Sequence, residues 1–180
     1  MANPSTLYRF RLDVSDVDRG FYEKLDFRVA MHPSETSDYL ITRVLAYALN
    51  FESGLEFSAG LSTSDEPAIG LRGKNGAIVK WIEIGNPSAR KLHKAAKAAK
   101  VVRVYTYKNP ENLKREMEGE SIHRASEIEV FSLRGDFLAE LSQCLKRDNA
   151  WGVIHTDGEL VVTVGEGVFI GALEGHRLGG

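Results

Sequence analysis

The stretch Ile78-Val-Lys-Trp-Ile-Glu-Ile-Gly-Asn-Pro87 decides the fold class that we expect for this chain. Residues 78–84 are strongly apolar, which is typical of a strand buried in a sheet. The glycine and asparagine that follow end the strand, and Asn86 and Pro87 favour the N-cap and first turn of a helix to about residue 99. Residues 101–107 are again β-branched and indicate a strand. A helix that links two strands predicts a parallel crossover in a mixed sheet.

Upstream of this crossover, we expect a helix and two more strands. Pro33 and Glu35 favour a helix that opens near residue 32, and apolar residues at helical spacing continue it to about Leu49. Residues 55–61 and 68–72 are the two strand candidates, and Gly73-Lys-Asn-Gly76 predicts a hairpin turn before strand 78–84. The central order is therefore helix, three strands, helix, strand.

The two ends of the sequence add further strands. Residues 6–14 and 22–30 alternate between apolar and polar side chains, which predicts an N-terminal strand pair. Residues 127–133 predict a strand and 136–146 an amphipathic helix. Residues 151–154, 160–164 and 168–173 predict a C-terminal antiparallel meander. We expect an α+β (α/β) fold with a mixed β-sheet flanked by helices, in a single domain over residues 1–180.

Composition excludes several classes of protein. The chain has 180 residues, 23 basic and 25 acidic, and a net charge of −2, which names no partner. The single cysteine, Cys144, excludes a disulfide framework and a cysteine-based zinc site. No apolar run approaches the roughly 18 residues of a membrane span, and the N-terminus lacks the apolar stretch of a signal peptide. We expect a soluble cytoplasmic protein that does not associate with membranes.

The charge is unevenly distributed. Between Pro87 and Lys108 the sequence has seven basic residues and no acidic one. Lysines on the exposed face of a helix are common, so a solvated face explains the segment as well as a binding site does. The alternative is an anion site, most plausibly for phosphate.

Three carboxylates stand where two adjacent strands could bring them together. Asp65 and Glu66 precede strand 68–72, and Glu83 lies near the end of strand 78–84, on the side of Val79 and Trp81. A carboxylate on a mostly buried strand is costly unless it is paired or binds a cation. A salt bridge to a nearby lysine or arginine and a metal site both satisfy this requirement.

Several short motifs together resemble the YaeQ family of bacterial proteins. They are His32-Pro-Ser-Glu-Thr36, Asp65-Glu-Pro67, Trp81-Ile-Glu83 with Gly85 and Pro87, then Arg90, Lys94-Ala95 and Tyr105-Thr-Tyr107. The resemblance runs over nearly the whole chain. YaeQ proteins are functionally uncharacterised, and their core resembles the PD-(D/E)XK, or restriction-endonuclease-like, nuclease fold. The order of helices and strands given above fits such a core.

This resemblance implies a metal site. In the nuclease motif, one acidic residue on each of two adjacent core strands binds Mg²⁺ or Mn²⁺. Asp65 matches the first, with Glu66 as its rival, and Glu83 matches the second. A carboxylate of the first core helix often assists, and Glu35 is the candidate.

The resemblance also implies a lysine and a partner. The motif lysine normally follows the second acid by two residues, where this chain has Gly85. Some nuclease families supply it from the next helix, which matches Lys94, with Lys91 as an alternative. The implied activity is metal-dependent phosphodiester hydrolysis, and the competing expectation is a non-catalytic module that binds nucleic acid or protein. Further candidates for nucleic-acid binding are Arg90, Lys91, Lys97, Lys100 and Arg103.

Overall fold

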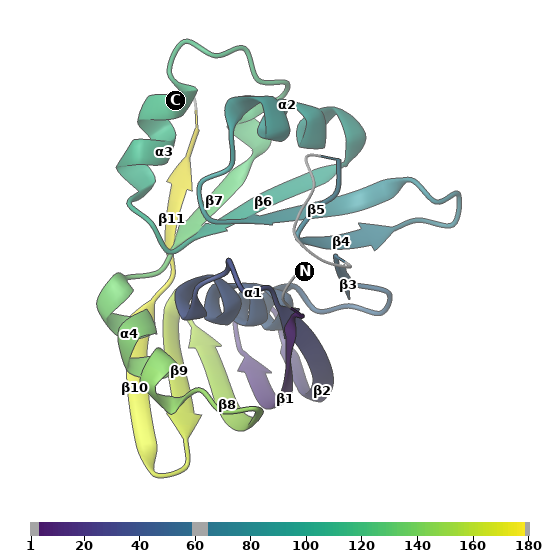
Figure 1. Cartoon of the computed structure of the whole chain (residues 1–180). Coiled ribbons are helices and arrows are strands. Elements are labelled where there is room, and N and C mark those ends of the chain that lie inside the picture. The colour runs from purple at the N-terminus through teal and green to yellow at the C-terminus, as the bar shows by residue number, and fades with distance from the viewer. Residues whose placement is uncertain (1–3, 59–64, 179–180) are drawn as a thin grey trace. The chain divides into compact units, whose positions relative to one another are not determined.

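The computed structural model describes residues 4–58 and 65–178, and it divides into two compact units. Unit 1 consists of Met1–Leu49 and Leu133–Leu173, and unit 2 of Asn50–Ser132 and Glu174–Gly180. Neither unit is a continuous stretch of sequence. The expectation that residues 1–180 form a single domain remains a prediction. Within the described residues, the chain forms an α+β structure of four α-helices and two mixed sheets (Figure 1).

Unit 1 contains a five-stranded sheet with the strand order β10-β9-β8-β1-β2. Its elements are β1 (Thr6–Asp16), β2 (Phe21–Met31), α1 (Ser37–Asn50), α4 (Gly135–Cys144), β8 (Asp148–Thr156), β9 (Glu159–Val164) and β10 (Gly167–Ala172). The N-terminal strand pair and the antiparallel meander are both confirmed.

Unit 2 contains a six-stranded sheet with the strand order β11-β7-β6-β5-β4-β3. Its elements are β3 (Glu56–Phe57), β4 (Ile69–Arg72), β5 (Ile78–Ile84), α2 (Ala89–Ala98), β6 (Val101–Thr106), α3 (Pro110–Met117), a 3₁₀ turn (Ala125–Glu127), β7 (Glu129–Ser132) and β11 (Glu174–Arg177). Strands β5 and β6 are parallel, so the crossover through α2 is confirmed.

The expected mixed sheet is confirmed in unit 2, and the N-terminal pair and the meander join each other in a second mixed sheet of their own. Strand β8 pairs in parallel with β1, with Trp151 opposite Leu12 and Val153 opposite Val14. These four side chains are buried and continue one apolar face across both strands. Alternation of side chains along each strand makes this face continuous only in that register.

Both helix starts differ from the expectation. The first helix begins at Ser37 rather than near residue 32, because Thr36 Oγ1 accepts a hydrogen bond from the Tyr39 N–H (3.1 Å) and acts as the cap. The second is capped by Ser88, whose hydroxyl accepts from the Lys91 N–H (3.1 Å). The Asn86 side chain instead accepts from the Thr106 hydroxyl (2.7 Å).

Two strands also differ from the expectation. Strand β3 covers only Glu56–Phe57, and residues 59–61 of the expected strand lie outside the described residues. Strand β11 was not expected, because Glu174-Gly-His-Arg177 has no apolar alternation. It pairs antiparallel with β7 and places the C-terminal segment in unit 2.

The core of unit 2 positions helix α2 on its sheet. Leu92, Ala95 and Ala96 of α2 pack against Trp81, Val102 and Val104 of β5 and β6. Arg124 holds the other end of the helix, donating hydrogen bonds to the carbonyl oxygens of Ala96 (2.9 Å) and Ala99 (2.7 Å). Helix α2 is therefore fixed along its length relative to strand β5.

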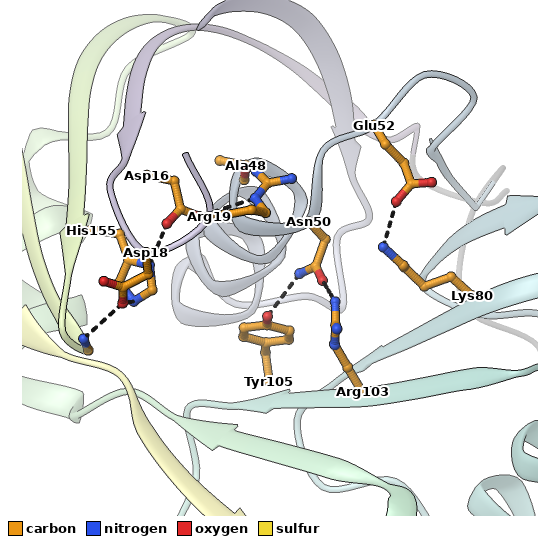
Figure 2. A network of polar contacts seen from close by, with 11 residues as sticks. Asp16, Asp18, Arg19, Ala48, Asn50, Glu52, Lys80, Arg103, Tyr105 and His155 are labelled. Carbon is orange, nitrogen blue, oxygen red and sulfur yellow. Dashed lines mark hydrogen bonds and ion pairs between the residues drawn. The ribbon is translucent and has the colours of Figure 1, made fainter. Parts of the chain in front are cut away.

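Unit 1 has a polar cluster where its two hairpins turn (Figure 2). The buried Asp16 carboxylate contacts His155 Nδ1 (2.9 Å) and Arg19 Nε (3.3 Å). Asp18 accepts hydrogen bonds from the Asp157 N–H (2.8 Å) and the Gly158 N–H. These hydrogen bonds lower the pKa of Asp18. The cluster ties the β1–β2 turn to the β8–β9 turn.

Candidate functional site

The Glu83 side chain lies near the end of β5, on the face that α2 covers, and is only 4% exposed. Its Oε1 accepts a hydrogen bond from Trp81 Nε1 (2.7 Å), and its Oε2 lies 3.2 Å from Lys91 Nζ. The Ala68 backbone N–H also donates to this carboxylate. Burial raises the pKa of Glu83, while the charge of Lys91 and these hydrogen bonds act in the opposite direction.

Helix α2 brings Lys91 to Glu83 from the first turn of the helix. Gly85 has a φ of +90°, a conformation that favours glycine, and Ser88 then begins the helix. Lys91 Nζ reaches inward to Glu83, and its side chain is 12% exposed. A salt bridge and a metal site were the two alternatives for the buried Glu83 carboxylate. The salt bridge is present, with Lys91 as the partner.

Asp65 forms an ion pair with Lys94 of α2. Lys94 follows Lys91 by three residues and lies on the same side of the helix. The Asp65 and Lys94 side chains are 70% and 50% exposed, so this pair is in contact with solvent, whereas the Glu83–Lys91 pair is buried. Asp65 is only three residues before Ala68, whose N–H bonds to Glu83. Two carboxylates thus meet two lysines of one helix face.

A surface groove of about 600 Å³ runs along this side of α2. It is lined by Asp65, Ser88, Arg90, Lys91, His93, Lys94, Lys97 and Ala98. Arg90 and Lys97 are exposed, and neither has an ion-pair partner within 4 Å in the part of the chain that the structure describes. Lys100, at the end of the helix, is exposed too. The groove is therefore basic, with Asp65 as its one acidic lining residue.

Glu66 and Glu35 are not among the residues that line this groove. Glu66 lines a different depression beside β3 and β4, together with Glu56 and Arg72. Glu35 belongs to unit 1, where its Oε2 lies 3.5 Å from Arg43 Nη2 and its Oε1 accepts from the His32 N–H. Of the candidate metal ligands, Asp65 and Glu83 are the two that pair with lysines of α2.

Tyr107 lies beside Gly85, the residue that stands at the position of the motif lysine. A side-chain carbon at this position would lie 3.6 Å from the Tyr107 ring, so the tyrosine occupies the space beside the glycine. Lys94 does not enter there and reaches Asp65 instead.

Arg103 lies on the other face of the sheet. Its neighbours Val102 and Val104 face α2, and alternation turns Arg103 and Tyr105 away from it. Arg103 contacts Glu129 Oε1 (3.0 Å) and Asn50 Oδ1 (2.6 Å), and Asn50 Nδ2 donates to the Tyr105 hydroxyl (2.9 Å; Figure 2). The buried Tyr105 ring also stacks on Phe131. Arg103 is therefore not part of the groove.

Three contacts around Glu83 and helix α2 were not predicted from the sequence. Trp81 donates to Glu83, and their spacing of two residues on one strand face could have suggested it. His93 Nδ1 accepts from the His123 N–H (3.0 Å), and Arg124 caps the end of α2. Nothing in the local sequence pairs these residues, because about 30 positions separate the members of each contact.

The groove offers an incomplete set of metal ligands. Within residues 4–58 and 65–178, no group of three or more histidine, cysteine, aspartate or glutamate residues could hold a metal ion. The carboxylate oxygens of Asp65 and Glu83 are nevertheless of the type that Mg²⁺ prefers, and Mg²⁺ is often held by one or two carboxylates plus substrate phosphates. Asp65 and Glu83 therefore fit such an ion in the type of their donor atoms. None of the helices in the same residue ranges is long and apolar enough to cross a membrane.

Comparison with known proteins identifies close relatives. Residues 1–170 match the family model described as YaeQ protein. The uncharacterised YaeQ proteins of Escherichia coli (strain K12) and Salmonella typhi are each 36% identical over 107 residues, which cover 59% of this chain and 59% of each relative. The match thus spans 59% of the length of these curated relatives.

Two solved structures match over almost the full length. The YaeQ protein from Xanthomonas axonopodis pv. citri superposes with a TM-score of 0.89 at 30% identity, covering 97% of this chain and 99% of that one. The YaeQ protein from Pseudomonas syringae gives a TM-score of 0.85 at 29% identity and covers 97% of both chains.

Proposed function

The chain belongs to the YaeQ family, and we propose that it is a divalent-metal-dependent enzyme that hydrolyses phosphodiester bonds of nucleic acid in the α2 groove. One observation carries the proposal. Glu83 and Asp65 are bound to two lysines of the same helix face, beside Arg90 and Lys97, which have no acidic partner among the described residues. Nucleic acid as the partner and Mg²⁺ or Mn²⁺ as the cofactor are parts of this proposal.

The order of the elements supports a nuclease-like core. Helix α1, strands β3, β4 and β5, helix α2 and strand β6 follow one another along the chain. This is the helix, three strands, helix, strand order that the PD-(D/E)XK resemblance implies. Fold alone does not establish function, so the proposal rests on the groove.

Asp65 and Glu83 would supply the oxygen ligands. A bound Mg²⁺ or Mn²⁺ supplies an activated water and neutralises charge on the phosphate. Lys91 acts on Glu83, because its charge opposes the rise in pKa that burial causes and so favours the ionised, ligating carboxylate. The chain thus keeps a buried acid available as a ligand.

Lys94 has a different part in this mechanism. Its ion pair with Asp65 is exposed, and exposed pairs contribute only about 0–1 kcal/mol. Lys94 can therefore exchange the carboxylate for a substrate phosphate at little cost and stabilise negative charge as it develops there. Arg90 and Lys97, one turn to either side, would hold neighbouring phosphates and position the chain of nucleotides.

Metal binding is the first test. Titration of the full-length protein with Mn²⁺, followed by the electron paramagnetic resonance of the free ion, should give one site per chain. Asp65→Asn and Glu83→Gln should each weaken it at least as much as the roughly 10- to 100-fold loss seen when a ligand's supporting partner is removed. Glu52→Gln is the matched control, since Glu52 also pairs with a lysine, but with Lys80 of β5 instead of a lysine of α2.

Turnover is the second test. Single- and double-stranded oligonucleotides of DNA and RNA, incubated with Mn²⁺, should be cleaved by the wild type and by Glu52→Gln. Cleavage should stop with EDTA and in Lys94→Met. If Mn²⁺ binds no more tightly to the wild type than to Asp65→Asn and Glu83→Gln, the proposal of a metal-dependent enzyme is wrong.

The alternative function is binding of nucleic acid without cleavage. It is favoured by the Glu83 carboxylate, which already has three donors, one of them the neutralising Lys91. In this case affinity should fall with salt even when no metal binds. Arg90→Gln and Lys97→Gln together should reduce the slope of log affinity against log salt by about 1.4–1.8. Lys74→Gln, in the turn between β4 and β5, should leave the slope unchanged.

A further inference from the structure

Strand β10 is an edge strand whose sequence lacks the residues that normally protect such an edge, although Phe137 of α4 packs over one face of it at Gly171. In the sheet of unit 1 it pairs with β9 on one side, and it is the last strand in the order (Figure 1). Its sequence, Gly167-Val-Phe-Ile-Gly-Ala172, has no charged residue and no proline. Charges, prolines and bulges are the usual means by which proteins prevent an edge from pairing with another chain. The free edge of β10 is therefore able to accept a further strand.

The side chains of β10 make this edge apolar. Val168 is 61% exposed and Ile170 is 64% exposed, more than any other large hydrophobic side chain in the described residues. Ile170 lies opposite Val161 of β9, which lies opposite Ile154 of β8, itself 43% exposed. A row of β-branched side chains thus crosses three strands and ends at the free edge. Exposed apolar patches that reach an edge are typical of interaction sites.

The sequence of β10 is symmetric about Phe169. On either side of the phenylalanine stands one β-branched residue, Val168 or Ile170, and then one glycine, Gly167 or Gly171. Antiparallel pairing about Phe169 would place Val168 opposite Ile170 of the other strand, and Gly167 opposite Gly171. Cross-strand pairs of β-branched residues are favourable.

The flanking charges also suit this register. Glu166 would lie opposite Ala172 of the other strand, and Glu174 opposite Val164. No carboxylate would therefore face another one, as like charges directly opposite each other would be unfavourable. A strand of unrelated sequence would not in general satisfy both conditions, whereas an identical strand does.

We propose that β10 pairs antiparallel with β10 of a second copy of this chain, about a two-fold axis at Phe169. The proposal is independent of the function of the α2 groove. The interface is isologous, since each copy contributes the same strand, so it closes as a dimer and leaves no further edge of the same kind. The apolar rows of the two sheets become continuous across it.

The test is the oligomeric state of the full-length chain. Sedimentation equilibrium over a range of micromolar concentrations should show a reversible dimer for the wild type. Val168→Lys together with Ile170→Lys should weaken dimerisation at least 100-fold, because like charges would then face each other across the axis. Leu7→Lys is the matched control: Leu7 is 54% exposed on β1, an interior strand of the same sheet, and its variant should dimerise as the wild type does.

Hydrogen exchange locates the interface. Amides of residues 167–172 should become more protected as the wild-type concentration rises, whereas those of the other edge strand, β2, should not change. A monomer at all concentrations overturns the proposal and leaves the edge to a strand of another protein. A dimer that persists in the double lysine variant, or that protects another strand, also overturns it. Circular dichroism confirms that the variants are folded.

Discussion

Removing Lys91 tests how the buried Glu83 carboxylate is stabilised. In Lys91→Met, the carboxylate keeps its hydrogen bonds from Trp81 and Ala68 but loses its counter-charge, 3.2 Å away. Breaking a buried ion pair by removing one partner costs about 3–5 kcal/mol. Because Glu83 can take up a proton and keep two donors, we expect the lower end, about 3 kcal/mol. For a chain of this size, this lowers Tm by roughly 6–12 °C.

Removing the charge of Glu83 while keeping Lys91 should cost less stability than Lys91→Met does. In Glu83→Gln, the amide oxygen still accepts hydrogen bonds from Trp81 and Ala68, and Lys91, already 12% exposed, can turn toward solvent. We expect a loss of about 1 kcal/mol, the typical net value of one hydrogen bond. Lys91→Met made in the Glu83→Gln background should then add little. The double-mutant cycle should give a coupling energy of about 3 kcal/mol in magnitude.

The penalty of Lys91→Met should depend on pH. Burial raises the pKa of Glu83 above 4.5, so the folded state keeps a proton that the unfolded chain has already lost. Stability therefore falls as pH rises from about 4.5 through the folded pKa. Loss of the lysine charge raises the pKa of Glu83 further and extends this fall to higher pH.

Urea unfolding at about pH 5 and about pH 8, followed by circular dichroism, measures this difference. Lys91→Met should be less destabilised at the lower pH, and the same change made in the Glu83→Gln background should show no such difference. A penalty that is the same at both pH values would refute the reasoning that a charged Glu83 needs Lys91.

Other contacts give further predictions. Arg124→Met removes donors to the carbonyls at the end of α2 and should lower the free energy of unfolding by about 1.5–3 kcal/mol. Arg134 is an exposed arginine paired with Asp136, so Arg134→Met should cost less than about 0.5 kcal/mol. Thermal melting compares the two variants. Ser88→Ala removes the N-cap of α2 and should cost about 1 kcal/mol in the same assay, with Ser88→Gly milder. The lowered pKa of Asp18 means that its contribution is present above about pH 3.8 and is lost on further acidification. Asp18→Asn should therefore melt lower than the wild type near neutral pH, and the difference should shrink at low pH.

Local patterns predicted the elements around α2 well. The apolar run before Gly85, the polar turn and the β-branched run after residue 100 predict β5, α2 and β6, because each signal lies within the element itself. The pairing of β1 with β8 could not be predicted in this way, since its partners are about 140 residues apart. The periodicity of a strand predicts which of its faces is apolar, but it does not predict which other strand pairs with it.

The candidate site shows the same limit. Helical spacing places Lys91 and Lys94 on one side of α2, but it does not say which lysine reaches which acid. The packing of α2 on the sheet decides this and directs Lys91 to Glu83 and Lys94 to Asp65. Glu35 was grouped with them through the family resemblance, and its contact with Arg43 in unit 1 depends on the fold around α1.

The division of both units along the chain has a consequence for biosynthesis. Strand β8, which flanks β1, is made only after the whole segment of unit 2 up to Ser132. Paired positions of β1 and β8 are about 140 residues apart along the chain. At about 5–20 residues per second, the ribosome takes roughly 7–28 s to add this many residues. During this time the apolar side of the nascent β1–β2 hairpin, with Phe10, Leu12 and Val14, has no β8 beside it. Vectorial synthesis thus leaves the sheet of unit 1 incomplete until most strands of unit 2 have been made, and the early hairpin is the segment that a ribosome-associated chaperone would protect.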